Sequence, residues 1–302
     1  MTGTGSAGSK VILLGEHGVV HGVDALVVGM DKGVRVQVTE SDTLRVEIAE
    51  WSVRASAADE RASSLETSLV DALVRMIEAL GLRDVHLAFN VQAAIPSQAG
   101  LGASASLGLA CARAVLDCFG LTCGDKGLFD AVLAFENVFH HNSSGVDIRA
   151  VSRTGCGIYN RHRGYESLAA AVPPLMIVHS GAPGATGQTV RQFANRLFHD
   201  TTGPGNLQRM GELVAAGRAA LEACDYNALG GWMNEAHQLL MWFGVSSDGL
   251  NSICEIARRA GARGAKLTGG GGGGCAVVLL PDEGERGRYE SVFHEAGYSV
   301  VM

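Results

Sequence analysis

The sequence has little that would mark a membrane-bound, secreted or nucleic-acid-binding protein. No apolar run approaches the roughly 20 residues that a transmembrane helix needs. Met1 to Ser9 is rich in Gly, Ser and Thr and has no apolar core, so we expect a flexible lead-in and not a signal peptide. Lys and Arg number 24 against 31 Asp and Glu, which gives a net charge of -7. Because phosphate backbones are bound through clustered Lys and Arg, we expect no nucleic-acid partner, and we also expect no membrane partner.

Paired cysteines are missing as well. The seven cysteines form an odd, scattered set with no C-x-x-C spacing, which argues against a disulfide framework and against a zinc site. A reducing compartment suits this pattern, so we expect a cytoplasmic protein. The 302 residues exceed the usual size of one hydrophobic core, and two domains that share a cleft are therefore expected.

What the sequence does contain is a strand, a glycine-rich loop and a helix in succession. Val85 to Gln92 alternates apolar and polar residues as a strand does, and Ile95 to Ser106 follows as a loop of small residues. Gly100 and Gly102 can adopt backbone angles closed to other residues. A helix that begins near Ser104 would point its positive end at a bound anion. The loop is predicted to cradle a phosphate; the alternative is a glycine-rich turn that binds nothing.

Ionisable residues gather around the first predicted strand. The apolar run Lys10 to Gly15 predicts a buried strand, and Glu16, His17 and His21 follow it. Each of these side chains, taken alone, is more often an ordinary solvated or half-buried residue. Their concentration within twelve residues favours a functional site.

Two carboxylates follow the loop. Glu136 lies near the end of a helix predicted over Gly124 to His140, and the polar turn after that helix ends in Asp147. Small and apolar residues surround Asp147, a setting in which catalytic acids are often found. The alternative is an aspartate that caps a turn.

Six consecutive glycines, Gly269 to Gly274, follow the segment Ala265 to Thr268. Ordering six glycines costs so much conformational entropy that we expect a reason for them. Close approach of the backbone to a ligand is the favoured reason, and a flexible hinge is the alternative.

Apolar periodicity predicts most of the remaining elements. Residues Leu65 to Leu80 repeat apolar side chains every three or four positions, which predicts an amphipathic helix whose stripe faces the core. Alternation over Leu26 to Thr39 predicts a half-exposed strand, and further helices are predicted at about Leu207 to Cys224, Tyr226 to Phe243 and Asp248 to Ala260.

Three motifs in this order resemble those of the GHMP kinase superfamily, named for galactokinase, homoserine kinase, mevalonate kinase and phosphomevalonate kinase. Lys10 to Gly22, KVILLGEHGVVHG, is similar to the opening strand and substrate loop of the mevalonate kinases within it. Pro96 to Ser106 resembles the P-x-x-x-G-L-G-S-S-A loop, and Lys266 to Cys275 resembles the K-L-T-G-A-G-G-G-G-C loop. Glu136 and Asn142 to Asp147 are similar to the E…H-G-N-P-S-G-V-D segment at the same spacing.

The resemblance implies an α+β, two-domain GHMP kinase fold. Its N-terminal domain, residues 1–168, would be similar to domain 2 of ribosomal protein S5 and would hold the phosphate loop and the catalytic base. Its C-terminal domain, residues 169–302, would be ferredoxin-like and would hold the third motif. The implied activity is transfer of the γ-phosphoryl group of ATP to the C5 hydroxyl of (R)-mevalonate, in isoprenoid precursor synthesis. ATP and mevalonate are then the small-molecule partners, and Mg2+ is the cofactor. Members of the family are often dimers, so a homodimer is expected.

The same resemblance assigns roles to single residues. Asp147 matches the catalytic base and Lys10 the lysine beside it, which would favour the ionised carboxylate and the developing alkoxide. Ser104 and Glu136 match the magnesium ligands, which are hard oxygen donors. The expected substrate-binding residues are Glu16, His17, His21 and Thr186. The expected ATP-binding residues are Pro96, Ala99, Gly100, Leu101, Gly102, Ala103, Ser104, Ala105, Ser106, Gly270 and Gly271.

A few positions depart from the family's pattern. Ala103 replaces the first serine of the phosphate loop, and Gly270 replaces an alanine, a change expected to reduce only rigidity. His141 and Ser143 stand where glycine and proline are usual, so the turn before Asp147 is expected to be less rigid.

The segment after the predicted base is one residue longer than usual and contains Arg149. We expect Arg149 either to bind a substrate carboxylate or a phosphate, or to point to solvent. The extra residue supports a second hypothesis, a sister kinase with a different hydroxyl acceptor. A third, a nucleotide-binding relative without catalysis, is disfavoured because the four residues matched to the base, its lysine and the metal ligands are intact. A dehydrogenase is disfavoured because no strand, G-x-G-x-x-G and helix unit has an acidic residue about 20 positions further on.

Overall fold

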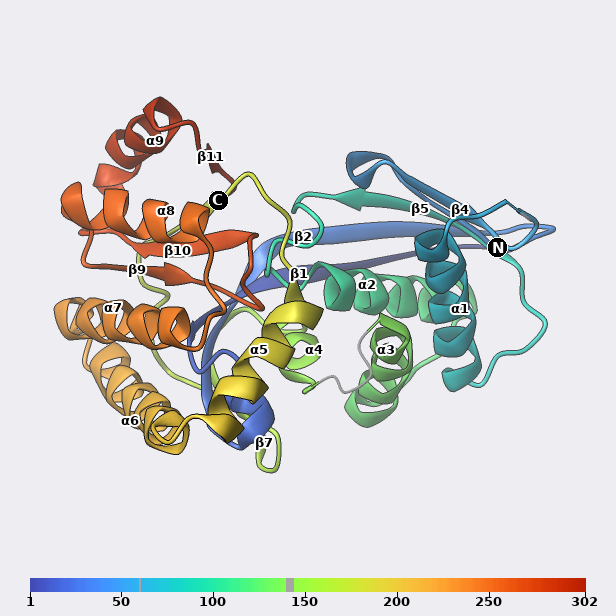
Figure 1. The fold of residues 1–302 in the computed structure, drawn as a ribbon. Helices are drawn as coiled ribbons and strands as arrows, with labels where there is room; N and C mark the ends of the chain where they lie inside the picture. Colours follow the sequence, from blue (N-terminus) through green and yellow to red (C-terminus); the bar gives the residue numbers. More distant parts are fainter. Residues whose placement is uncertain (60, 140–143) are drawn as a thin grey trace. The chain divides into compact units, whose positions relative to one another are not determined.

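The computed structural model describes residues 1–59, 61–139 and 144–302, which form two compact units (Figure 1). Unit 1 consists of Met1–Ser9, Met30–Ser97 and Gly102–Thr154, and unit 2 of Lys10–Gly29, Gln98–Leu101 and Gly155–Met302. Each unit is thus assembled from three separate stretches of chain. The strands β1 (Thr2–Leu14) and β2 (Ala25–Glu40) contribute residues to both units. The domain division between residues 168 and 169 stays a prediction.

Unit 1 is a β-sheet with helices packed on one face (Figure 1). Its strands lie in the order β4-β3-β5-β2, and β1 also pairs with β2. Strands β3 and β5 are parallel, whereas β3 pairs antiparallel with β4 and β2 with β5. Besides its parts of β1 and β2, unit 1 contains β3 (Arg45–Ile48), the short 3-10 helix η2 (Ala49–Trp51), β4 (Val53–Ser56), α1 (Ser64–Ala79), β5 (Leu87–Ala93), α2 (Ala103–Cys118), α3 (Asp125–Phe139) and α4 (Val146–Val151).

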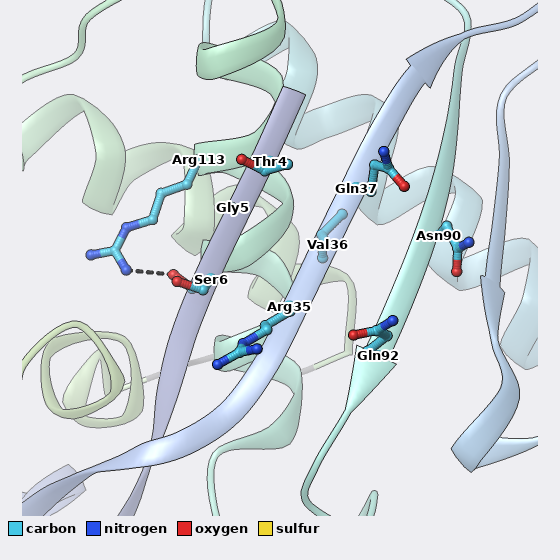
Figure 2. Close-up of a pocket in the computed structure, with 9 residues that line it drawn as sticks. All are labelled: Thr4, Gly5, Ser6, Arg35, Val36, Gln37, Asn90, Gln92 and Arg113. Carbon is cyan, nitrogen blue, oxygen red and sulfur yellow. Dashed lines mark hydrogen bonds between the residues drawn. The ribbon is translucent and has the colours of Figure 1, made fainter. Parts of the chain in front are cut away.

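Alternation along the strands decides which face of this sheet is buried. Val36 pairs with Val91, and Val38 with Phe89; all four side chains are buried. The residues between them point to the other face, which is polar and carries Arg35, Gln37, Asn90 and Gln92 (Figure 2). The half-exposed strand predicted over Leu26 to Thr39 is thereby confirmed, and the period of two has the physical reason that successive side chains leave opposite faces.

The predicted amphipathic helix is α1. It begins with a capping box in which the Ser63 hydroxyl accepts from the Glu66 N–H at 3.3 Å and the Glu66 carboxylate accepts from the Ser63 N–H at 2.7 Å. The buried stripe consists of Leu69, Ala72, Leu73, Met76 and Ile77.

The flexible lead-in predicted for Met1 to Ser9 is wrong, because nearly all of it belongs to β1. A Cβ added to Gly3 would lie 2.3 Å from the carbonyl oxygen of Ala114, and one added to Gly5 would lie 2.2 Å from that of Ala110. Any side chain at these positions would therefore collide with the backbone of α2. The glycines permit close packing of strand on helix, and this use of glycine cannot be told from flexibility without knowing what lies opposite.

Unit 2 contains a four-stranded antiparallel sheet with the order β11-β8-β10-β9. Numbered along the chain within this sheet, the strands therefore lie in the order fourth, first, third and second. This is the arrangement of a ferredoxin-like fold, as predicted. Unit 2 holds the 3-10 helix η1 (Gly18–His21), β6 (Gly155–Asn160), β7 (Gly164–Ser167), β8 (Leu175–His179), α5 (Thr186–His199), α6 (Gly203–Glu222), α7 (Tyr226–Trp242), α8 (Asp248–Arg259), β9 (Gly264–Leu267), β10 (Cys275–Leu279), the 3-10 helix η3 (Glu283–Glu285), α9 (Arg286–Glu295) and β11 (Ser299–Val300).

Helices and strands of unit 2 share one hydrophobic core. Helices α7 and α8 pack on β9, and α8 also packs on β10. The largest side chains of this core are fully buried, and they are Phe193, Phe243, Tyr289 and Phe293. Strand β6 pairs with the first residues of β2 and with β7.

All seven cysteines are free thiols, and five of them are buried, which agrees with the predicted absence of a disulfide framework. In residues 1–59, 61–139 and 144–302 no helix combines the length and the apolar character needed to cross a bilayer.

Candidate active site

Lys10 is tied to the glycine-rich loop within unit 2. Its side chain is buried, and its ammonium group donates to the carbonyl oxygen of Gly100 at 2.9 Å. Its backbone N–H donates to the carbonyl oxygen of Leu101 at 3.1 Å. Gly100 has a φ of +80°, and a Cβ there would lie 2.3 Å from the Thr268 carbonyl oxygen, so only glycine fits. A cation is thus fixed against the loop predicted to cradle phosphate.

In unit 1 the same loop passes into α2, as the sequence predicted. Gly102 precedes the helix with a φ of +73°, and no described side chain caps the helix start. The first amides of the helix, those of Ala103, Ser104 and Ala105, have no intrahelical acceptor. Together with the helix dipole these amides form an end that suits a phosphate group.

Ser106 is engaged inside unit 1. Its hydroxyl donates to the carbonyl oxygen of Gly8 at 2.5 Å, and its N–H donates to the Gly102 carbonyl oxygen at 2.8 Å. Both hydrogen-bond donors of Ser106 are therefore bonded to backbone carbonyl groups of unit 1. Its predicted contact with ATP stays a prediction, as do those of the other loop residues.

Ser104, Glu136 and Asp147 lie on three helices of unit 1 that pack against one another, α2, α3 and α4. One turn after Ser104, Gly108 admits the ring of Phe135, because a Cβ at Gly108 would lie only 2.9 Å from that ring. Phe135 directly precedes Glu136, which is buried, whereas Ser104 and Asp147 are half-buried. The packing of α2 on α3 thus places the helical turn that carries the Ser104 hydroxyl next to the turn that carries the Glu136 carboxylate.

Helix α4 was not predicted from the sequence, which suggested only a polar turn before Asp147. Gly145, with a φ of +79°, precedes the helix, and Asp147 lies in its first turn. A carboxylate is favoured there by the positive end of the helix. The predictions made for His141 and Ser143 fall outside the described residues.

Arg149 does not point freely to solvent, so that alternative is wrong. Its guanidinium carbon lies 4.1 Å from the centre of the Phe129 ring, and the residue is half-buried. Two residues along an α-helix correspond to a rotation of about 200°, so Arg149 leaves α4 on the side away from Asp147.

Glu16 and Lys266 form a buried ion pair within unit 2. The Lys266 ammonium group donates to the Glu16 carboxylate and to the carbonyl oxygen of Leu267 at 2.6 Å, and neither side chain is more than 1% exposed. Burial raises the pKa of Glu16 and lowers the pKa of Lys266, while the opposite charge of the partner works against each shift. Sequence reasoning placed Glu16 at the substrate and did not single out Lys266.

His17 and His21 stack on the same aromatic side chain. The ring of Phe193 from α5 lies 5.1 Å from that of His17 and 5.6 Å from that of His21, both nearly parallel. The Nε2 atom of His17 lies 2.9 Å from the Gly270 carbonyl oxygen. Because a carbonyl can only accept, Nε2 carries the proton. Burial lowers the pKa of His17 to about 4, so the ring is neutral at pH 7. No sequence signal pointed to Phe193.

The six glycines are ordered and packed against the chain itself. A Cβ at Gly271 would lie 2.0 Å from the Val245 carbonyl oxygen, and one at Gly273 would lie 2.2 Å from that of Pro183. The segment therefore does not form a flexible hinge, because it lies close to other parts of the backbone. Close approach to a ligand stays a prediction. The expectation that glycine in place of alanine at 270 reduces only rigidity is wrong, since a Cβ there would lie 2.3 Å from the hydroxyl oxygen of Thr186.

The donors present suit a metal ion that arrives with a phosphate ligand. No cluster of three or more His, Cys, Asp or Glu side chains that could hold a metal ion occurs among the described residues. Ser104 and Glu136 provide a hydroxyl and a carboxylate on packed helices. Magnesium is usually held by one or two such hard oxygen donors together with phosphate oxygens, so the residues fit this kind of site.

Comparison with known proteins identifies the family. Residues 68–155 match the GHMP kinases N terminal domain, and residues 218–299 match the GHMP kinases C terminal domain. A mevalonate kinase of Thermococcus sibiricus is 30% identical over 298 residues, which cover 92% of this chain and 89% of that protein. The chain belongs to the GHMP kinase family. It is therefore a kinase that acts on an alcohol group, with ATP and a divalent metal ion.

Solved structures of this GHMP kinase family share the fold. L. major mevalonate kinase in complex with R-mevalonate has a TM-score of 0.83 and 26% identity, covering 98% of this chain and 92% of that one. Lactococcus lactis galactokinase complexed with galactose has a TM-score of 0.81 at 17% identity, covering 99% of this chain and 92% of that one. Since kinases of two different acceptors match almost equally well, the fold alone does not decide the acceptor.

Proposed function

We propose that this kinase transfers the γ-phosphoryl group of ATP to the C5 hydroxyl of (R)-mevalonate, giving 5-phosphomevalonate and ADP. The observation that carries the proposal is the sequence likeness to a mevalonate kinase over 92% of the chain. The segment Lys10 to Gly22 resembles the corresponding motif of mevalonate kinases, which supports the same acceptor.

In this proposal Asp147 is the general base. Its carboxylate, in the first turn of α4, accepts the proton of the C5 hydroxyl as the oxygen attacks the γ-phosphorus atom. The ammonium group of Lys10, fixed on the Gly100 carbonyl oxygen, stabilises negative charge that develops during transfer. Ser104 and Glu136 would hold Mg2+. When bound, that ion neutralises charge on the β- and γ-phosphates.

The acceptor is assigned to the loop after β1. His17, His21 and Thr186 are proposed to contact mevalonate, with His17 neutral and oriented by the Gly270 carbonyl oxygen and the Phe193 ring. The buried ion pair suggests that Glu16 acts by holding this loop in place through Lys266, instead of reaching the substrate. The cytoplasmic location and the homodimer remain predictions from the sequence.

The alternative of a sister kinase with another acceptor loses its support from Arg149. That hypothesis rests on the extra residue after Asp147, and the arginine of this segment, Arg149, stacks on Phe129 on the other side of α4.

An acceptor panel tests the proposal. ADP release is measured with a coupled assay on the purified chain with ATP, Mg2+ and either mevalonate, phosphomevalonate, homoserine or galactose. We expect turnover with mevalonate and none above background with the other three. Turnover with one of the others and not with mevalonate would overturn the proposed acceptor and leave the kinase family intact.

A further inference from the structure

Three arginines line a small cavity between α2, α3 and α4 of unit 1. The cavity has a volume of about 180 Å³, and its lining includes Arg113, Arg149, Arg153, Asp125, Phe129 and Ser152. None of the residues assigned to phosphoryl transfer is among the residues that line it. Asp125 is the one carboxylate of the described lining, and its side chain is 89% exposed.

Two of these arginines, Arg113 and Arg149, form no ion pair with a carboxylate of the described residues. Arg113 is half-buried and donates to the Ser6 carbonyl oxygen at 2.6 Å, the contact drawn dashed in Figure 2, and burial lowers its pKa. Arg149 rests on the face of the Phe129 ring. A guanidinium has five N–H donors, so one carbonyl or one ring leaves most of the donors of these two arginines unused.

The third arginine closes the cavity at the end of α4. Arg153 donates to the Ser152 hydroxyl at 2.8 Å and to the Arg149 carbonyl oxygen at 3.4 Å, and it lies 3.7 Å from the Asp125 carboxylate. These contacts fix its orientation. Three arginines thus line a space that one mostly exposed carboxylate borders.

The size of the cavity limits what it can take. About 180 Å³ corresponds to roughly six water molecules at ~30 Å³ each. This is room for a tetrahedral oxyanion, and it is below the ~300 Å³ at which pockets for larger ligands begin. The planar fork of a guanidinium matches the oxygens of a phosphate group.

We propose that this cavity binds a phosphate-type oxyanion, either inorganic phosphate or the phosphate group of a small metabolite. The bound anion would connect α2 and α4 through Arg113 and Arg149. Asp147 lies on the opposite side of the same six-residue helix α4, so occupancy would act on the position of the proposed base.

A control arginine is available in the same unit. Arg35 lines a larger cavity of about 660 Å³ on the polar face of the sheet, and Arg113 borders this cavity as well (Figure 2). Arg149 lines the three-arginine cavity and not the larger one, so it is the variant that distinguishes the two cavities. Figure 2 shows the guanidinium groups of Arg35 and Arg113 on either side of β1. Removing Arg35 therefore removes one positive charge from unit 1 without touching the three-arginine cavity.

The test is thermal unfolding titrated with inorganic phosphate at constant ionic strength. A saturating non-hydrolysable ATP analogue with Mg2+ is present throughout, so that the nucleotide site is filled. We expect phosphate to raise the Tm of the native chain, because a ligand that binds only the folded state stabilises it. Arg149→Met and Arg113→Met should each weaken phosphate binding about tenfold or more, as loss of a charge-assisted hydrogen bond does. Arg35→Met should bind phosphate as the native chain does.

Three results would overturn the proposal: no rise in Tm with phosphate while the analogue is bound, equal phosphate binding by Arg149→Met and the native chain, or an equal loss in Arg35→Met. If a methionine variant fails to fold, Arg149→Lys replaces it, and we expect partial retention of binding. Glycerol 3-phosphate distinguishes the two sources. Tighter binding of this monoester than of inorganic phosphate points to a metabolite, and tighter binding of inorganic phosphate points to the free ion.

Discussion

The polar groups of the two units are held in different ways. In unit 1, Ser104 and Asp147 lie in the first turns of helices and are half-buried. In unit 2, Glu16, His17 and Lys266 are buried and bound to one another or to backbone. Side chains of the first kind can be changed at little cost to the fold, whereas those of the second kind are part of the core. We therefore expect activity and stability to separate in unit 1 and to change together in unit 2.

Asp147→Asn should give the largest effect and the cleanest separation. Without a base the rate of transfer to mevalonate is expected to fall by about 10²- to 10⁴-fold, while the Tm and the affinity for an ATP analogue stay close to native. Coupled kinetics, thermal unfolding and analogue titration measure the three quantities. Asp130→Asn, on the surface of α3, is the matched control and should retain turnover. Native turnover by Asp147→Asn would remove the assignment of the base.

Lys266→Met should show the opposite behaviour in unit 2. It leaves the Glu16 carboxylate buried without its cation, which is expected to lower the free energy of unfolding by about 3–5 kcal/mol. Urea unfolding gives this quantity. The double variant Glu16→Gln with Lys266→Met should recover part of the loss, because no charge remains unpaired.

The control for this pair is Arg259→Met, which breaks the exposed pair with Glu255 in the same unit and should change stability little. A loss in Lys266→Met no larger than in this control would show that the buried pair contributes nothing special to unit 2.

Acid should destabilise unit 2 through its buried histidines. Burial lowers the pKa of His17 and of His237 to about 4, below the usual 6.5 of an unfolded chain. The unfolded state therefore takes up protons first, and stability is lost as the pH falls from 6.5 to 4, by up to about 3 kcal/mol for each histidine. His237→Asn should flatten this dependence in urea unfolding measured across the window. His294→Asn, exposed on α9, should leave the slope unchanged; equal slopes in the two variants would exclude His237 as a source.

Gly270→Ala should have the smallest effect and act locally. The added methyl group would press on the hydroxyl and the Cβ of Thr186, and we expect a stability loss of about 1 kcal/mol, at the low end for overpacking, because Thr186 is exposed at the start of α5, where a small backbone shift relieves the contact. The KM for mevalonate should rise while the KM for ATP changes less. Gly231→Ala on α7, which has no neighbouring atom within 4 Å, should be neutral or slightly stabilising. An unchanged KM for mevalonate would separate Gly270 from the acceptor site.

The sequence was informative wherever a pattern depends on neighbours along the chain. The stripe over Leu65 to Leu80 and the alternation over Val85 to Gln92 predicted α1 and β5, because side-chain direction follows backbone period. The phosphate loop and its helix were predicted for the same reason. The four residues assigned to catalysis and metal binding came from resemblance, and their roles stay predictions.

Features that depend on distant residues escaped prediction. Whether Gly3 and Gly5 are flexible or tightly packed depends on α2, more than 100 residues further along the chain. Glu16 and Lys266 are separated by 250 residues, so nothing local indicates that they pair. The stacking of Arg149 on Phe129 requires helix α4, and the sequence pattern predicted only a polar turn before Asp147.

The interleaving of the two units has a consequence for biosynthesis. Residues Lys10–Gly29 leave the ribosome early, yet the largest part of their unit, from Gly155 onward, is made only after all of unit 1. The apolar strand residues Val11 to Leu14 are therefore synthesised long before most of the unit that buries them. Lys266, the partner of Glu16, is synthesised near the end of the chain. Closing such long loops slows folding. During translation this waiting strand is the part of the nascent chain most in need of protection from aggregation.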